Sequence, residues 1–253
     1  MRPGHRPLVI TTPTTLGKRG GRHVERAVFL PEPGEALLVI DLSQIDARAV
    51  AAHSQDPGFR ALFEDGRDFH TEVATRILGD PAKREVAKTL NHSVNYGVGA
   101  RKLASMADVP LPVAEDYLRG MAAQYPQWAA WKQAVVEARP PGELLDNGFG
   151  RKLRVDPDHA WTAGPAAIGQ ACARDLLMEG LLRLDAAGLI PHLRCVVHDE
   201  VILSVPAEAY PDIAHQVLDC LTFDWAPPGA DRPIRITATL GNRPGLNWSH
   251  VYE

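Results

Sequence analysis

Short apolar runs alternate along this chain with polar, turn-forming residues, and the pattern predicts a set of buried strands. Runs of Val, Ile and Leu are typical of strands inside a sheet. We expect a tight turn at His198-Asp199 to divide the longest run into two strands. A second hairpin is expected around Asn147-Gly148, because an Asn-Gly pair favours a hairpin turn. The segments expected to form strands are 27–30, 36–40, 144–145, 151–155, 194–205 and 234–240.

Helical periodicity occupies most of the remaining chain. Between 45 and 78 the apolar spacing is helical, with breaks at 56–58 and 64–66 where Gly and acidic residues cluster. Asp80-Pro81 predicts another helix start, since Asp is a preferred N-cap and Pro is favoured at the first helical position. An antiparallel sheet with segregated helices is an α+β fold. The other helices are expected at 81–96, 100–107, 112–123, 126–138, 165–187 and 207–221.

The composition is that of an ordinary globular protein and excludes several classes. A chain of 253 residues, 45% hydrophobic and 23% charged, can bury a substantial core. Its three cysteines lack CxxC spacing, which argues against a disulfide framework or a zinc site. No apolar run approaches the roughly 18 residues of a membrane span. We therefore expect a cytoplasmic protein without a membrane partner.

The net charge of -4 argues weakly against a nucleic-acid partner, because such proteins commonly carry a basic excess. Two local basic clusters stand against this average, one at the N-terminus and one formed by Arg151, Lys152 and Arg154. Basic clusters form either a solvated surface or a set of phosphate contacts, and both interpretations stay open. The N-terminal cluster consists of Arg2, Arg6, Lys18, Arg19, Arg22 and Arg26.

Two acidic residues stand at the ends of apolar runs. Asp41 directly follows the strand expected at 36–40, and Asp199 lies in the turn of the later strand pair. If these strands lie side by side, the two carboxylates come together and favour a cation between them. Mg²⁺ prefers such oxygen ligands and is commonly held by one or two carboxylates plus substrate phosphates. The pattern indicates two-metal phosphoryl transfer, and a simple acidic turn residue is the alternative at either position.

Four side chains at a spacing of four residues line one stripe of the helix expected at 81–96. Arg84, Lys88, His92 and Tyr96 drift by only about 40° per step around the helix axis. Cations near the helix N-terminus suit triphosphate oxygens, and rings further along suit a sugar and base. The stripe therefore matches a nucleotide laid along the helix, with an exposed polar face as the alternative.

These segments resemble the motifs of the DNA polymerase I family, also called family A. Asp41 to Arg48 resembles motif A, Arg84 to Gly97 resembles motif B, and Val197 to Glu200 resembles motif C. The resemblance extends from about Pro13 to Trp248. It implies an α+β palm, an antiparallel sheet with flanking helices, joined to a helical fingers subdomain. The implied parts are 1–55 as N-terminal palm with motif A, 56–142 as fingers with motif B, and 143–253 as C-terminal palm with motif C.

The resemblance also implies the activity and the residues that perform it. A DNA-directed DNA polymerase is a nucleotidyltransferase, and Asp41, Asp199 and the carbonyl of Leu42 would bind its two Mg²⁺ ions, with Mn²⁺ as a substitute. Lys88 is expected to act in catalysis as well as in binding. The residues expected to bind the incoming nucleotide are Gln44, Asp46, His70, Arg84, Lys88, His92 and Tyr96. Those expected to contact DNA are Arg22, Arg151, Gln170 and His198.

Three positions depart from the family pattern. His92 stands where the family usually has Phe or Tyr against the sugar. Asp46 stands where the family usually has Glu, which walls off the ribose 2′-hydroxyl, so a shorter wall predicts weaker exclusion of ribonucleotides. Residues 163–166 lack the Arg and Asn that the family often places there, which predicts a weaker grip on the template.

The family's thumb and exonuclease-like domains have no counterpart in this sequence, so we expect a fragment or one subunit of a split polymerase. The expected partners are primer-template DNA, dNTPs and a separate thumb-supplying or processivity protein. One alternative is a polymerase-fold protein that binds nucleotide or DNA with little or no catalysis. Another is a metal-dependent phosphohydrolase, which the absence of a denser acidic cluster disfavours.

Overall fold

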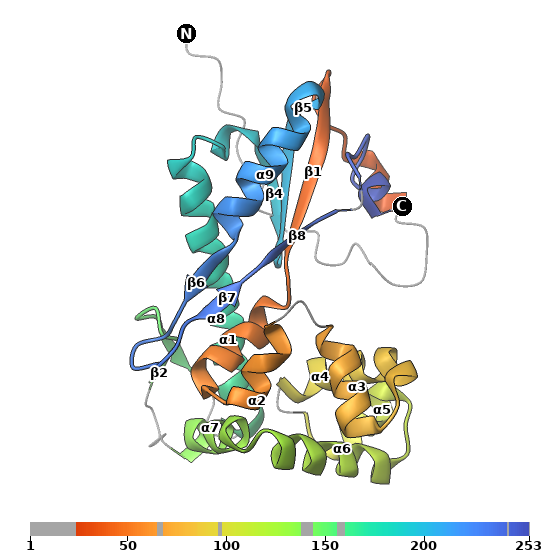
Figure 1. Cartoon of the computed structure of the whole chain (residues 1–253), viewed down its shortest axis with the longest axis vertical. Helices are drawn as coiled ribbons and strands as arrows, with labels where there is room; N and C mark the ends of the chain where they lie inside the picture. Colours follow the sequence, from red (N-terminus) through yellow and green to blue (C-terminus); the bar gives the residue numbers. More distant parts are fainter. Residues whose placement is uncertain are drawn as a thin grey trace. The chain divides into compact units, whose positions relative to one another are not determined.

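A computed structural model of the chain describes residues 24–64, 68–95, 98–137, 144–155, 160–241 and 243–252. These residues form two compact units (Figure 1). The first contains the described residues up to Ile45, together with Leu176–Phe223 and those from Ile236 onward, and the second contains Asp46–Asp175 and Asp224–Arg235. This division differs from the expected palm and fingers boundaries, which stay a prediction.

A four-stranded sheet in the order β4-β5-β1-β8 forms the centre of the first unit. β1 pairs antiparallel with β5 on one side and with β8 on the other, and β4 pairs antiparallel with β5. Both central strands are buried along almost their whole length, as their runs of Val, Ile and Leu predict. The strands are β1 Glu35–Leu42, β4 Leu193–Val197, β5 Glu200–Pro206 and β8 Ala238–Leu240.

Side chains on the two faces of β1 pack against different elements. Leu37 and Val39 belong to one apolar cluster with Trp248 and Val251. The alternating residues of β1 are also fully buried, and helix α9 (Tyr210–Leu221) contacts β1, β5 and β8. Helix α8 (Ala160–Ala186) approaches α9 closely at Gly180, where a Cβ atom would lie 2.6 Å from the side chain of Leu221. The sheet is therefore covered by short segments from the second half of the chain.

Helices make up most of the second unit. A two-stranded hairpin accompanies them, and two further strands, β6 Phe223–Trp225 and β7 Ile234–Ile236, pair with each other. The hairpin consists of β2 Leu144–Asp146 and β3 Lys152–Arg154. The helices are α1 Ile45–Ser54, α2 Pro57–Arg60, α3 Phe69–Leu78, α4 Arg84–Asn95, α5 Ala100–Ala107, α6 Leu111–Gln124 and α7 Pro126–Glu137, with the first part of α8.

One buried carboxylate joins two helix starts beside the aromatic core of this unit. Asp56 is 1% exposed, and its Oδ1 accepts a hydrogen bond from the backbone N–H of Phe59 in α2. Its Oδ2 accepts from the N–H groups of Gln127 and Trp128 in α7. The ring of Phe59 meets that of Tyr125 edge to face at 5.4 Å. Asp56 thus satisfies orphan N–H groups of two helices and fixes both against the aromatic core.

Most of the expected elements are confirmed. The strand at 36–40, the β4–β5 hairpin, the hairpin around Asn147 and the helices from 45 to 137 are present. Asp80 caps its helix, because its side chain accepts from the N–H of Ala82, although the first turn is a 3₁₀ helix, η3 Pro81–Lys83. In the described part of the chain, no helix is long and apolar enough to cross a membrane.

Three expected elements were wrong in type or extent. At 27–30, where a strand was expected, Ala27 and Val28 end a 3₁₀ helix, η1 Val24–Val28. Phe29 then packs edge to face on Trp248, and its carbonyl oxygen accepts from the backbone N–H of Trp248. The strand expected at 234–240 divides into β7 and β8, which join different sheets, and β6 was not expected. Helix α8 begins before Pro165, which lies inside it at the cost of one backbone hydrogen bond.

We predict that Asp56→Ala lowers the free energy of unfolding by about 2–4 kcal/mol, because three buried N–H groups lose their acceptor. Asp56→Asn keeps one carbonyl oxygen and should cost less. Chemical denaturation measures both, with Asp80→Ala as the control, where the lost cap should cost only about 1 kcal/mol. Equal losses at positions 56 and 80 would contradict the double cap.

Candidate active site

The two predicted metal ligands lie at adjacent strand ends in the first unit. β1 and β5 pair from Glu35 opposite Pro206 to Asp41 opposite Glu200. The N–H of Leu42 donates to the carbonyl oxygen of Asp199 at 2.9 Å. Asp41 and Asp199 are both partly exposed, while Leu42 is fully buried between them and the core. The predicted pairing of these strands is confirmed, and the metal-binding role of the carboxylates stays a prediction.

Backbone strain occurs close to both aspartates. Val197 pairs with Glu200, so the β4–β5 turn consists of His198 and Asp199 alone. His198 is exposed and has a φ of 58°, a left-handed conformation that costs a non-glycine residue roughly 1–2 kcal/mol. Gln44, three residues after Asp41, also has a positive φ, 52°. Strained residues of this kind gather at functional sites, although a two-residue hairpin turn also favours positive φ. The roles predicted for His198 and Gln44 stay predictions.

Glu200, next to Asp199, is directed into the core. Its side chain is 2% exposed and lies 3.5 Å from the guanidinium of Arg26, which is itself 3% exposed. The same guanidinium lies over the ring of Trp248, 4.1 Å from its centroid. Arg26 is therefore a buried structural cation, which fits neither interpretation that the sequence left open for it, a solvated surface or a phosphate contact. The predicted DNA contact Arg22 lies outside the described residues.

The stripe on α4 is partly described, in the second unit. Arg84 forms a bidentate ion pair with Asp68, with Nε 3.1 Å from Oδ1 and Nη2 2.9 Å from Oδ2. Burial of Asp68 opposes its ionisation, but hydrogen bonds from Arg84 and Thr71 outweigh this effect and lower its pKa. Lys88 lies one helical turn further on, with its side chain exposed. The side chain of His92 and all of Tyr96 lie outside the described part of the chain.

His70 lies in the first turn of α3 and faces α4. Its Nδ1 is 3.2 Å from the amide nitrogen of Asn91, which belongs to α4. Burial lowers the pKa of His70 to about 4, an effect that Asp68 opposes and Arg84 supports. The imidazole is therefore neutral near pH 7, with one nitrogen occupied by Asn91. Its position two residues after Asp68 places it beside the Arg84 ion pair.

Two further substrate and DNA candidates, Asp46 and Gln170, lie on helices of the second unit. Asp46 is in the first turn of α1, where its Oδ1 accepts from the N–H of Ala47 at 2.8 Å. The role of Asp46 as a short wall against the ribose 2′-hydroxyl stays a prediction. Gln170 is exposed on α8.

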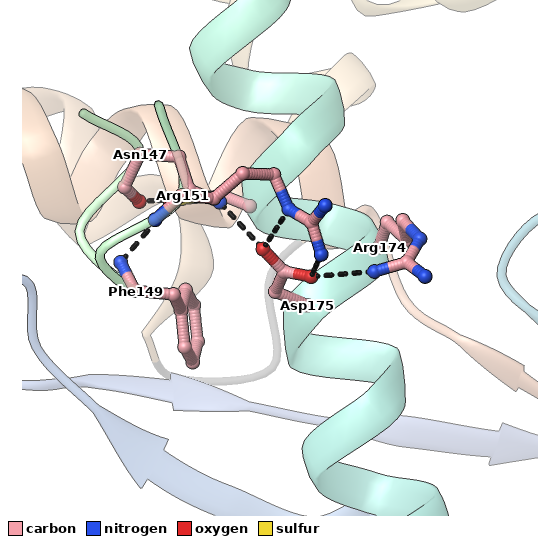
Figure 2. Close-up of polar contacts among 6 residues, drawn as sticks. Asn147, Phe149, Arg151, Arg174 and Asp175 are labelled. Carbon is pink, nitrogen blue, oxygen red and sulfur yellow. Dashed lines mark hydrogen bonds and ion pairs between the residues drawn. The ribbon is translucent and has the colours of Figure 1, made fainter. Parts of the chain in front are cut away.

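The basic turn at Arg151 is anchored to α8 by one carboxylate, as Figure 2 shows. Arg151 donates from Nε and Nη2 to Asp175 at 2.8 and 2.7 Å. Arg174 donates to the same carboxylate at 2.8 Å, and the amide nitrogen of Asn147 donates to it at 2.7 Å. The Asn147 oxygen accepts the N–H groups of Phe149 and Arg151, which fixes the turn. Arg151, a predicted DNA contact, thus already uses Nε and Nη2, the two nitrogens of a bidentate contact, to bind a carboxylate of the protein.

Several residues that fix the candidate side chains by hydrogen bonds or ion pairs were not expected from the sequence. Asp68 and Asp175 lie in segments that resemble the family, yet neither was assigned a contact. The N-cap position of Asp68, whose side chain accepts from Thr71, is a local signal that could have identified it. Asn91 is adjacent to the stripe but turned inward, at 2% exposure. No local signal links Asp175 to Arg151 or Arg26 to Glu200.

The candidate metal ligands are suited to magnesium. Among the described residues, no group of three or more His, Cys, Asp or Glu side chains is arranged to hold a metal ion. The donors predicted from the sequence, the carboxylates of Asp41 and Asp199 and the backbone oxygen of Leu42, stay a prediction. Such a set fits Mg²⁺, which takes one or two carboxylates and completes its shell with water and phosphate oxygens. It does not match the nitrogen and sulfur ligands of a structural zinc site.

A family model described as DNA polymerase family A matches residues 13–245. This chain belongs to DNA polymerase family A. The DNA polymerase of Mycobacterium phage L5 is 35% identical over 196 residues, covering 76% of this chain and 32% of that protein. The thermostable DNA polymerase I of Thermus thermophilus is 30% identical over 238 residues, covering 87% of this chain and 28% of that protein.

The fold is also that of a family A polymerase region. The POL domain of Pol1 from M. smegmatis, solved in complex with DNA primer-template and dNTP, matches with a TM-score of 0.79 at 21% identity. The match covers 95% of this chain and 45% of that one. It confirms the predicted α+β polymerase architecture. The chain spans only about a third of the length of the curated relatives it matches.

The Arg151–Asp175 network predicts a pH dependence of stability. The hydrogen bond from Arg151 is the largest cause that lowers the pKa of Asp175 to about 2; partial burial opposes it, and Asn147 and Arg174 assist. Because this folded pKa lies below the unfolded value, the stabilisation is present above about pH 4 and is lost toward pH 2. It amounts to about 2 kcal/mol, since one pKa unit corresponds to about 1.4 kcal/mol.

Arg151→Ala should therefore raise the pKa of Asp175 and lower the free energy of unfolding at pH 7, with little effect at pH 2. Urea unfolding between pH 2 and pH 7 measures this. The control is Arg119→Ala, whose ion pair with Asp116 is exposed on both sides and should contribute about 0.5 kcal/mol or less. A loss at Arg151 that does not change with pH would contradict the network.

Proposed function

We propose that this protein performs template-directed DNA synthesis, transferring a nucleotidyl group from a dNTP to a primer 3′-hydroxyl. The observation that carries the proposal is the register of β1 and β5, which sets Asp41 and Asp199 at adjacent strand ends in a member of family A. The structural relative in complex with DNA primer-template and dNTP supports the same substrates. A separate thumb-supplying or processivity protein is proposed as a further partner.

Asp41, Asp199 and the carbonyl of Leu42 would hold two Mg²⁺ ions, with Mn²⁺ as a substitute. When bound, these ions supply Lewis-acid activation of the primer hydroxyl and charge stabilisation at the leaving pyrophosphate. The protein's contribution is rigidity, because Asp41 stands on β1 and Asp199 in the two-residue turn before β5, and both strands are fixed by hydrogen bonds and a buried core. Little reorganisation is then needed when the substrates bind.

Arg84 and Lys88 would bind the triphosphate, and Lys88 would also neutralise charge that develops on the leaving pyrophosphate. The Asp68 carboxylate already occupies the guanidinium fork that a phosphate would use. Both side chains of this pair are 39% exposed, so the pair is worth about 0–1 kcal/mol and can be exchanged at little cost. The other proposed nucleotide contacts are Gln44, Asp46, His70, His92 and Tyr96, and the proposed DNA contacts are Arg22, Arg151, Gln170 and His198.

The subdomain division and the location complete the proposal. Residues 1–55 and 143–253 would form the palm, and 56–142 the fingers. A cytoplasmic location is supported by the free thiols of Cys172, Cys195 and Cys220, which are typical of a reducing compartment.

The decisive test is primer extension with Mg²⁺ and the four dNTPs. The wild-type protein should add nucleotides, and Asp41→Asn or Asp199→Asn should reduce the rate by about 100-fold or more, the scale of losing a key electrostatic group in an active site. Asp212→Asn, which neutralises an exposed acid on α9, is the matched control. Thermal unfolding checks that each variant keeps its fold. A wild type that extends no primer, or aspartate variants with normal rates, would refute the proposal.

A second experiment concerns the fork of Arg84. Arg84→Ala should raise the KM for dNTP by about 10-fold or more, the value of one charge-assisted hydrogen bond. Asp68→Asn should lower the same KM, because it removes the competing charge while Asn remains a good cap for α3. Steady-state kinetics on both variants and on Lys88→Ala provide the measurement. An unchanged KM in Arg84→Ala would show that Arg84 serves only its ion pairs with Asp68 and Glu85.

A further inference from the structure

A chain of hydrogen bonds runs through the interior of the second unit, from α6 through α4 to α3. The hydroxyl of Tyr117 in α6 donates to Oδ1 of Asn91 in α4. The amide nitrogen of Asn91 then lies 3.2 Å from Nδ1 of His70 in α3. Tyr117 and Asn91 are 1% and 2% exposed, whereas His70 is only partly buried. The chain therefore connects a closed interior to a ring that solvent or a ligand can reach.

The tyrosine determines the direction of this chain. A buried phenol proton needs an acceptor, because leaving it without one costs about 1–3 kcal/mol. The acceptor for Tyr117 is Oδ1 of Asn91. With its oxygen used in this way, the Asn91 amide presents N–H to His70, so Nδ1 of His70 must accept and carry no proton. The proton of the neutral imidazole is then on Nε2.

The groups around His70 also favour the neutral form of its ring. Burial is the largest influence and lowers its pKa to about 4; Arg84 and Lys88 also lower the pKa, while Asp68 and Glu85 raise it. Burial raises the pKa of Tyr117, which keeps the phenol protonated as a donor. Protonating His70 on both nitrogens would set its Nδ1–H against the N–H of Asn91. Geometry and desolvation therefore both favour the neutral ring.

We propose that Tyr117 and Asn91 are positioning residues that fix His70 as the neutral Nε2–H tautomer, so that it offers one uncharged donor to a phosphate oxygen of the incoming nucleotide. This inference rests on the proposed function, in which His70 contacts that phosphate. Beside Arg84 and Lys88, such a donor adds direction without adding charge. Its hydrogen bond would also be independent of pH through the neutral range.

Two substitutions change this chain in different ways. Tyr117→Phe keeps the ring in the core and removes only the donor that orients the Asn91 amide, so both His70 tautomers should become populated. Asn91→Asp replaces the amide with a group that only accepts, so it should place a proton on Nδ1 of His70 and raise the pKa. Tyr125→Phe removes another fully buried tyrosine hydroxyl, outside this chain, and is the matched control.

Nitrogen NMR of the full chain with labelled histidine reads the tautomer directly, since protonated and unprotonated ring nitrogens have well-separated shifts. His70→Gln assigns the signal among the 10 histidines. We expect an unprotonated Nδ1 in the wild type and in Tyr125→Phe, a mixture in Tyr117→Phe, and a protonated Nδ1 in Asn91→Asp. The measurement uses the free protein and does not depend on catalysis. Should Asn91→Asp fail to fold, Tyr117→Phe alone decides.

Kinetics then test the link to the nucleotide. Tyr117→Phe should raise the KM for dNTP by about 2- to 10-fold, the range of one neutral hydrogen bond, with kcat nearly unchanged. In Asn91→Asp the KM should vary with pH between 6 and 8, whereas that of the wild type should not. An unaltered tautomer in both variants overturns the proposal. An altered tautomer with an unaltered KM also overturns it, because His70 would then make no contact with the phosphate. The proposed DNA synthesis is tested separately, by the variants of Asp41 and Asp199.

Discussion

The antiparallel pairing of β1 with β5 is the constraint on which the candidate active site depends. It sets Asp41 opposite Glu200, and the adjoining hydrogen bond from Leu42 holds Asp199 in place. A shift by one residue would exchange the two faces of β1, moving Leu37 and Val39 away from Trp248. Each face is packed against different partners, so the shifted register would leave both poorly packed. Core packing therefore determines which carboxylates meet at the strand ends.

In the helical unit, buried or half-buried carboxylates hold neighbouring elements together. Asp56 joins the starts of α2 and α7, Asp68 joins the start of α3 to α4, and Asp175 joins α8 to the β2–β3 hairpin. The more deeply such a carboxylate is buried, the more its hydrogen bonds contribute to the stability of the fold. Asp56 has no access to water and must keep its partners, whereas the partly exposed Asp68 can exchange Arg84 for another anion at little cost.

The elements that could be predicted from sequence are those whose signals are local. The strand at 36–40 and the helix start at Asp80 were recognised because apolar runs and cap residues stand next to each other in the chain. The run at 27–30 was assigned the wrong structure because its partner, Trp248, is distant in sequence. The split between β7 and β8 likewise depends on which strand each half meets, which periodicity does not encode.

The site shows the same limit. Asp41 and Asp199 became candidates because each ends an apolar run. The strand pairing expected between them is confirmed, and their metal-binding role stays a prediction. The ion pairs Arg26–Glu200 and Arg151–Asp175 were not foreseen, because no sequence spacing connects a cation to a carboxylate that only the fold brings near. A net charge of -4 was equally uninformative, since it averages over basic residues that the fold separates into buried and exposed ones.

In the proposed nucleotide site, Arg84 and His70 would present a donor to phosphate in two physically different ways. Arg84 carries a permanent charge, so it binds an anion strongly but is matched in the free protein by an internal anion, Asp68, that must be displaced. His70 is neutral and needs no counter-ion, but a neutral imidazole has two tautomers, and only one leaves a donor on the outer nitrogen. The buried Tyr117–Asn91 pair removes this ambiguity before any ligand arrives. A site built from both kinds of donor gains attraction from the exchangeable charge and orientation from the fixed hydrogen bond.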